Sequence, residues 1–118
     1  MKKILFVVHH APVGTIWVNE AFRTALGMYA GDDLEPSVLL LDRAVAALNA
    51  ALAPDKVGLL PCSLAQKQLN RFGTQLYAVK EDLSAYRVEN LDEGYPVTLV
   101  SKEHLSKLFH EHNFVIWM

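Results

Sequence analysis

The hydrophobic residues of this chain fall into five short, largely continuous runs, and the segments between the runs carry hydrophobic residues at helical spacing. The five runs cover residues 4–8, 38–41, 76–79, 97–100 and 114–118. Continuous runs of this length are typical of strands that are buried on both faces of a parallel sheet. The helical stripe after the first run consists of Val18, Ala21, Phe22, Ala25 and Tyr29. This alternation predicts a three-layer α/β/α fold with a parallel sheet of about five strands, flavodoxin-like in appearance.

Residues that favour helix starts and helix ends mark the boundaries of the other helices. Asp42 follows the second run and is placed to cap a helix. Ser63 begins a capping box with a glutamine three residues later. The helix that it starts is expected to end at Gly73, which favours a left-handed backbone. Residues 80–86 are expected to form a short helix or turn, and Ser101 is expected to cap the last helix.

Length and composition favour one globular domain over residues 1–118. Of the 118 residues, 52% are hydrophobic and 20% are charged, a balance typical of folded proteins. The formal net charge is −2, and no basic run could follow a phosphate backbone, so direct nucleic-acid binding is not expected. No run approaches the roughly 20 apolar residues of a membrane helix. Lys2 and Lys3 precede a run that is too short for a secretory signal, so we expect a cytoplasmic protein.

The loop after the first run is the first candidate site, because ligands of open parallel sheets bind beyond the carboxyl ends of the strands. His9 and His10 follow the run directly, and at most one of them is expected to face this crevice if the strand persists that far. Gly14 and Thr15 lie where backbone N–H groups and a helix start could hold an anion. The loop matches neither a Walker phosphate loop nor a dinucleotide fingerprint. A plain strand-to-helix turn is therefore favoured, and no cofactor is expected.

Thiol and metal chemistry each depend on few residues. Cys62 is the single cysteine, which excludes an internal disulfide. It lies just before the Ser63 helix, whose dipole would stabilise a thiolate, although a buried and unreactive cysteine is the commoner case. His110 and His112 would lie about 200° apart on a helix. With His104 they also lack the four-residue spacing of zinc helices, so no metal site is expected.

Four segments of the chain, together with the short helix that contains Leu83, follow the pattern of one protein family. The segments cover residues 11–15, 42–45, 95–97 and 113–116. Over nearly its whole length the chain resembles the DsrE/DsrF-like sulfur-relay family, and specifically its DsrF/TusC branch. The resemblance implies a small parallel α/β domain that assembles into trimers, hexamers or mixed hexamers. In catalytic members of the family, a cysteine just after the third strand carries a persulfide and passes sulfur between proteins, for transfer RNA thiolation or sulfur oxidation.

The sulfur-carrying position of the family falls at or next to Val79, where this chain has no cysteine. The resemblance therefore implies a partner subunit without a catalytic residue of its own. It would belong to a homo-oligomer, or to a hetero-oligomer with DsrE/TusD-like and DsrH/TusB-like subunits. Trp17 and Trp117 are candidate interface anchors, because tryptophan is enriched at interface hot spots. Two alternatives stay open: a thiol-based sulfur carrier that uses Cys62, and a module that binds a small ligand or nucleotide at residues 9–15.

Overall fold

The computed structural model describes residues 2–12, 16–28, 33–48, 71, 73–88 and 97–118. In chain order its elements are β1 (Lys2–Val8), α1 (Trp17–Met28), β2 (Leu34–Leu40), the 3₁₀ helix η1 (Asp42–Leu48), β3 (Gln75–Val79), α3 (Lys80–Ala85), β4 (Thr98–Val100), the 3₁₀ helix η3 (Lys102–His104), α4 (Leu105–His110) and β5 (Phe114–Trp117). Within these ranges, no helix has the length and apolar character needed to cross a bilayer.

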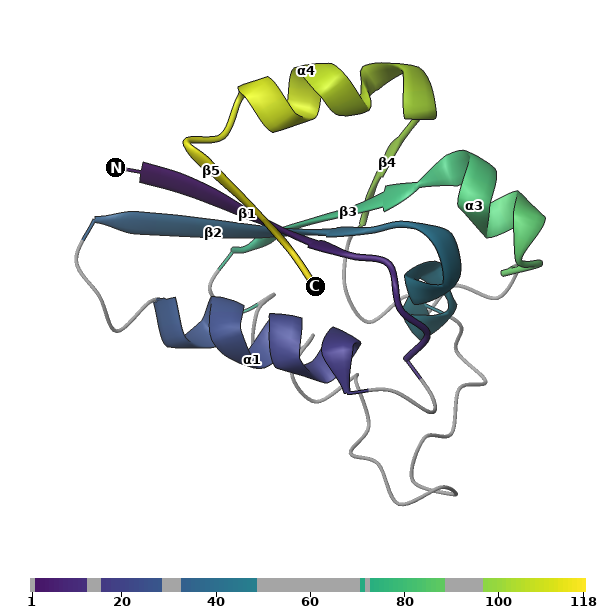
Figure 1. The fold of residues 1–118 in the computed structure, drawn as a ribbon, viewed down its shortest axis with the longest axis horizontal. Helices are drawn as coiled ribbons and strands as arrows, with labels where there is room; N and C mark the ends of the chain where they lie inside the picture. The colour runs from purple at the N-terminus through teal and green to yellow at the C-terminus, as the bar shows by residue number, and fades with distance from the viewer. Residues whose placement is uncertain (1, 13–15, 29–32, 49–70, 72, 89–96) are drawn as a thin grey trace.

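The five strands form a parallel sheet in the order β4-β3-β2-β1-β5. The chain runs outward from β1 through β2 and β3 to β4, and then returns to add β5 on the other side of β1 (Figure 1). In this register, Phe6 of β1 lies between Val38 of β2 and Ile116 of β5. The predicted parallel sheet of about five strands is thus confirmed.

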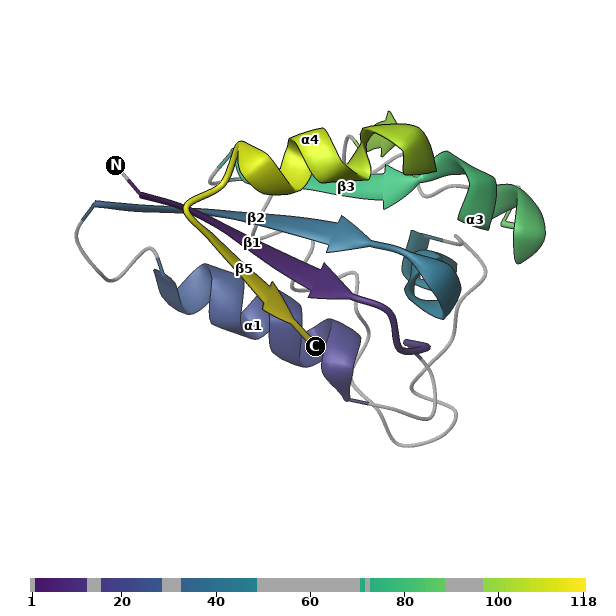
Figure 2. The same cartoon turned by 45° about the horizontal axis from the view of Figure 1, so that its top comes forward.

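Helices cover both faces of the sheet, which confirms the predicted α/β/α layers. α1 lies along one face and α4 lies against the other (Figure 2). On the α1 face, Phe6 packs in a buried cluster with Phe22 of the helix. On the α4 face, Leu5 packs in a second buried cluster with Leu39 and Leu108. Neighbouring residues of β1 therefore enter opposite cores, and this explains why its hydrophobic run is continuous rather than alternating.

The helices follow the predicted stripes with differences at their first residues. The predicted core positions of α1 within the described ranges are all buried: Val18, Ala21, Phe22 and Ala25. Asp42 is the first residue of η1 rather than the residue before it, and its φ is 51°. Ser101 precedes η3 as expected, but its hydroxyl contacts Nδ1 of His104 and makes no capping hydrogen bond. Tyr29 and the start of the helix predicted at Ser63 lie outside the described residues.

Gly73 has the left-handed backbone that the sequence predicts, with a φ of 72°. Replacing it with alanine is expected to lower the free energy of unfolding by about 1 kcal/mol, because a Cβ is strained at positive φ even in open space. Gly27 of α1 also has open space around an added Cβ. As a control, Gly27→Ala is expected to raise the free energy of unfolding by about 0.5–1 kcal/mol. Urea unfolding measures both effects, and equal stability of the two variants would contradict the assignment.

Candidate functional site

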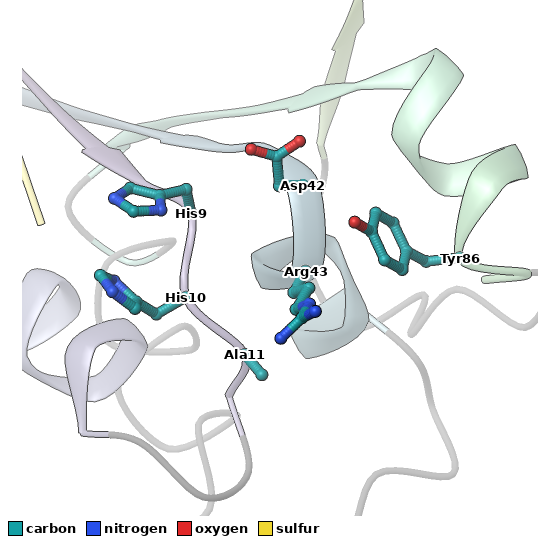
Figure 3. A pocket seen from close by; sticks show the side chains of 6 residues that line it. All are labelled: His9, His10, Ala11, Asp42, Arg43 and Tyr86. Carbon is teal, nitrogen blue, oxygen red and sulfur yellow. The ribbon is translucent and has the colours of Figure 1, made fainter.

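A cavity of about 420 Å³ opens beyond the carboxyl ends of β1 and β2. Its lining residues come from three places in the chain: His9, His10 and Ala11 follow β1, Asp42 and Arg43 begin η1, and Tyr86 follows α3. Figure 3 shows the two imidazoles on one side of this cavity and the tyrosine ring on the other. The cavity therefore lies at the edge of the sheet where parallel α/β proteins bind their ligands. We call it the carboxyl-end pocket.

Both histidines line the carboxyl-end pocket, whereas the sequence predicted at most one for a strand that continued through them. The structural reason is that β1 ends at Val8, so the alternation of side chains between the two sheet faces stops before His9. The two rings lie with their centroids 4.2 Å apart and their planes tilted by 34°. Nδ1 of His10 is buried and has no hydrogen-bond partner among the described residues. An unpaired buried donor or acceptor costs about 1–3 kcal/mol, so His10 holds its ring here without a compensating hydrogen bond from the described residues.

A row of aromatic rings holds the two histidines between α1 and α4. The ring centroids of His10 and Trp17 lie 5.8 Å apart, and those of His9 and Trp117 lie 6.3 Å apart. Trp117 in turn meets the ring of Phe109 edge-on at 5.9 Å. Aromatic contacts at these separations are favourable beyond the area that they bury. The row therefore orients the imidazoles from both sides, although Trp117 remains 57% exposed.

The other wall of the pocket is fixed by Asp82 of α3, which is only 3% exposed. One carboxylate oxygen of Asp82 accepts a hydrogen bond of 2.7 Å from the backbone N–H of Asp42. The other oxygen lies 3.3 Å from Nζ of Lys102. Asp42 itself has the positive φ that aspartate tolerates better than most residues. Asp82 thus holds the unusual backbone at the start of η1, from which the side chains of Asp42 and Arg43 reach the pocket.

The neighbouring Glu81 makes a second link between α3 and the segment after β4. Its carboxylate accepts a hydrogen bond of 3.1 Å from the backbone N–H of Lys102. This hydrogen bond lowers the pKa of Glu81 below its usual range. Glu81 is exposed whereas Asp82 is buried, so the two adjacent carboxylates make similar contacts in very different surroundings.

Known proteins were compared with the chain as a whole. No protein-family model and no curated protein matches it. Among solved structures, YchN from E. coli matches over 100% of both chains, with a TM-score of 0.84 at 18% identity. MTH1491 from Methanobacterium thermoautotrophicum also matches over 100% of both chains, with a TM-score of 0.72 at 15% identity. BT1422 from Bacteroides thetaiotaomicron covers 98% of this chain and 94% of its own, with a TM-score of 0.68 at 11% identity.

YchN and MTH1491 are DsrE/DsrF-like fold proteins. This chain shares the fold of these two proteins, with TM-scores of 0.84 and 0.72. At such low identities the likeness concerns the fold alone, and MTH1491 and BT1422 are themselves described as proteins of unknown function. The sheet and its layers therefore belong to a shared architecture, and the chemistry must be argued from the residues of this chain.

The end of β3 is the place where the family resemblance puts a sulfur-carrying cysteine. Here the strand ends at Val79, which is fully buried in the core cluster on the α4 face with Leu39 and Leu108. The next residue, Lys80, is exposed and begins α3. The junction is thus occupied by an apolar side chain that points into the core and by a lysine, and neither can carry a persulfide.

Of the remaining predicted site residues, some are described by the structure and others lie outside the described residues. Gly14, Thr15 and Cys62 lie outside the described residues, so the proposed anion loop and thiol stay predictions. His112 contacts the carbonyl oxygen of Leu108 through Nδ1 at 2.8 Å, and His110 ends α4. No group of three or more residues of the metal-ligating types His, Cys, Asp and Glu comes together in the described parts of the chain.

Sequence reasoning did not assign Asp42, Arg43, Tyr86 or Asp82 to a site. Asp42 and Arg43 follow the second hydrophobic run just as the histidines follow the first. The rule that ligands gather beyond strand ends would have found this pair if it had been applied to both strands. Tyr86 and Asp82 carried no comparable signal, because they reach the edge of the sheet from a helix whose position depends on the tertiary fold.

Proposed function

We propose that this chain is a partner subunit of a sulfur-relay assembly, of the DsrF/TusC kind, which binds a sulfur-carrying subunit without carrying sulfur itself. The observation that supports this proposal most directly is the junction of β3 and α3. The position at which the family resemblance puts the carrier cysteine is held by Val79, and Val79 is fully buried. A thiol placed there would be enclosed by apolar side chains, and such surroundings disfavour the reactive thiolate.

The electrostatics of the junction support the same conclusion. Glu81 and Asp82 follow Lys80 in the first turn of α3. The buried Asp82 is committed to the hydrogen bond with Asp42 and the ion pair with Lys102. A neighbouring negative charge disfavours the formation of another anion such as a thiolate or persulfide. The segment therefore serves to hold α3, η1 and η3 together, which is a structural task.

Exposed hydrophobic residues at one edge of the sheet support an assembling role. Those around β5 and the start of α1 are Ile16, Trp17, Phe114, Ile116 and Trp117, which are between 40% and 57% exposed. We call them the β5 surface. β5 is the last strand in the sheet order, and the two predicted tryptophan anchors both belong to this surface. Exposed hydrophobic patches mark sites of protein association, so the β5 surface is the proposed contact with a second subunit, either another copy or a carrier subunit, in the cytoplasm.

Sulfur loading tests the passive role directly. The purified chain is incubated with a cysteine desulfurase and cysteine, together with a sulfur-accepting protein as a positive control, and intact masses are then measured. The positive control is expected to gain about 32 Da, the mass of one sulfur atom in a persulfide, and this chain is expected to gain nothing. A gain of the same mass that disappears in the Cys62→Ser variant would overturn the proposal and establish the thiol-carrier alternative instead.

A further inference from the structure

The carboxyl-end pocket brings together more hydrogen-bond donors than acceptors. Arg43 provides a permanent positive charge, and the imidazoles of His9 and His10 and the hydroxyl of Tyr86 provide further donors. Asp42 is the single carboxylate among the lining residues that the structure describes. In Figure 3 its oxygens point away from the guanidinium of Arg43 and lie at the opposite end of the pocket. The arrangement favours a ligand that accepts hydrogen bonds and carries negative charge.

The polar side chains of this pocket have no hydrogen-bond or ion-pair partners among the described residues. Within the described parts of the chain, the side chains of Arg43, Asp42 and Tyr86 make no hydrogen bond or ion pair, and the imidazoles make ring contacts alone. Nδ1 of His10 is in addition buried. The backbone beneath them is nevertheless held firmly, since Asp82 anchors the N–H of Asp42 at 2.7 Å. A fixed set of unpaired polar groups around a cavity is the arrangement expected of a binding site.

We infer that the carboxyl-end pocket binds a small oxyanion of the phosphate and sulfate type, held by Arg43 with the imidazoles of His9 and His10. A guanidinium binds such groups through two parallel hydrogen bonds. The cavity of about 420 Å³ also leaves room for an organic substituent on the oxyanion. Inorganic anions and phosphorylated molecules share this chemistry. The inference is independent of the proposed sulfur-relay role, because a partner subunit and a stand-alone binding module would both use the pocket in the same way.

Calorimetric titration of the full chain at constant ionic strength tests the inference with three probes: inorganic phosphate, thiosulfate and adenosine monophosphate. We expect at least one probe to bind, and we expect Arg43→Gln to weaken that binding about tenfold or more, as the loss of a charge-assisted hydrogen bond does. Arg43 is exposed, so the variant should fold normally. Lys107→Gln removes the same charge from an exposed position on α4 and is expected to leave the affinity unchanged.

Replacement of Asp42 by asparagine tests the inference independently, because it is expected to change the affinity in the opposite direction to Arg43→Gln. Asparagine tolerates the positive φ of this position, and the hydrogen bond to Asp82 comes from the backbone and is retained. Loss of the carboxylate should strengthen oxyanion binding on the order of threefold, because a repulsive charge is removed. Binding by the inorganic probes or by the nucleotide supports the inference and distinguishes the two sources. Absence of binding by all three, an unchanged affinity in Arg43→Gln, or weaker binding in Asp42→Asn would overturn it.

Discussion

Asp82→Ala is expected to lower the free energy of unfolding by about 2–3 kcal/mol. The variant leaves the backbone N–H of Asp42 without its acceptor at a residue whose φ is 51°. It also removes the ion pair with Lys102, whose side chain is 58% exposed. Because Lys102 remains in contact with water, the loss of the ion pair contributes less than the loss of the buried hydrogen bond. Most of the expected change therefore comes from the link between α3 and η1.

Two further variants separate these contributions. Asp82→Asn keeps an oxygen that can accept the hydrogen bond from Asp42 and loses only the charge, so its destabilisation should be about half that of the alanine variant. Glu81→Gln changes the adjacent carboxylate, which is exposed, and is expected to leave the urea midpoint essentially unchanged at pH 7. Equal destabilisation by Asp82→Ala and Glu81→Gln would contradict the structural role assigned to Asp82.

The choice of pH matters for this comparison. The pKa of Glu81 is lowered from its ordinary value of 4.5 because its carboxylate accepts the N–H of Lys102. A group with a lowered pKa in the folded state contributes stability above its unfolded pKa and loses it as the pH falls through the folded value. Any contribution from Glu81 is therefore complete at pH 7 and fades only in acid. Measurements at pH 7 therefore compare the variants under conditions in which the Glu81 contribution is fully present.

The sheet could be predicted from the sequence because strands that are buried on both faces consist of continuous hydrophobic runs. Leu5 and Phe6 are neighbours that enter opposite cores, so the strand that contains them reads as an unbroken hydrophobic run. The hydrophobic pattern does not determine the order of the strands in the sheet. Whether β5 pairs with β1 or extends the sheet beyond β4 depends on the direction of one crossover, and the hydrophobic pattern of β5 is the same in either place.

The carboxyl-end pocket could be predicted only in part, for a similar reason. The histidines were found because they adjoin the most regular strand of the chain. Their shared orientation was not predicted, because it depends on β1 ending at Val8, and pattern reasoning locates a strand end only to within about two residues. The hydrogen bond between Asp82 and Asp42 joins residues 40 positions apart. Contacts of this kind are set by tertiary packing, which local periodicity does not record.

The β5 surface has the properties of an interface that is still uncovered in the isolated chain. Phe114 and Ile116 pair in register with Ile4 and Phe6 of β1, so they point to the α1 side of the sheet. They are nevertheless 51% and 41% exposed, whereas Ile4 and Phe6 are buried. Trp117 points to the other side and is 57% exposed. An edge strand whose hydrophobic side chains are exposed on both faces is a favourable site for pairing with another subunit.

Ile116→Lys is expected to convert an oligomer of this chain into monomers, because a charge at the centre of a hydrophobic interface costs about 2 kcal/mol or more, which weakens association about 30-fold. Light scattering after size exclusion measures the change. The protein concentration is about 10 μM, which is above a micromolar Kd.

Leu99→Lys is the matched control, since Leu99 is a 48% exposed hydrophobic residue on β4 at the opposite edge of the sheet. A monomeric unmodified chain would contradict assembly of identical copies through β5, and an oligomer that survives Ile116→Lys but dissociates in Leu99→Lys would contradict assembly through β5 altogether. Ile116 takes no part in the aromatic row around His9 and His10. Equal urea midpoints of the variant and the unmodified chain, measured at a concentration where both are monomeric, would therefore place the effect at the interface rather than in the fold.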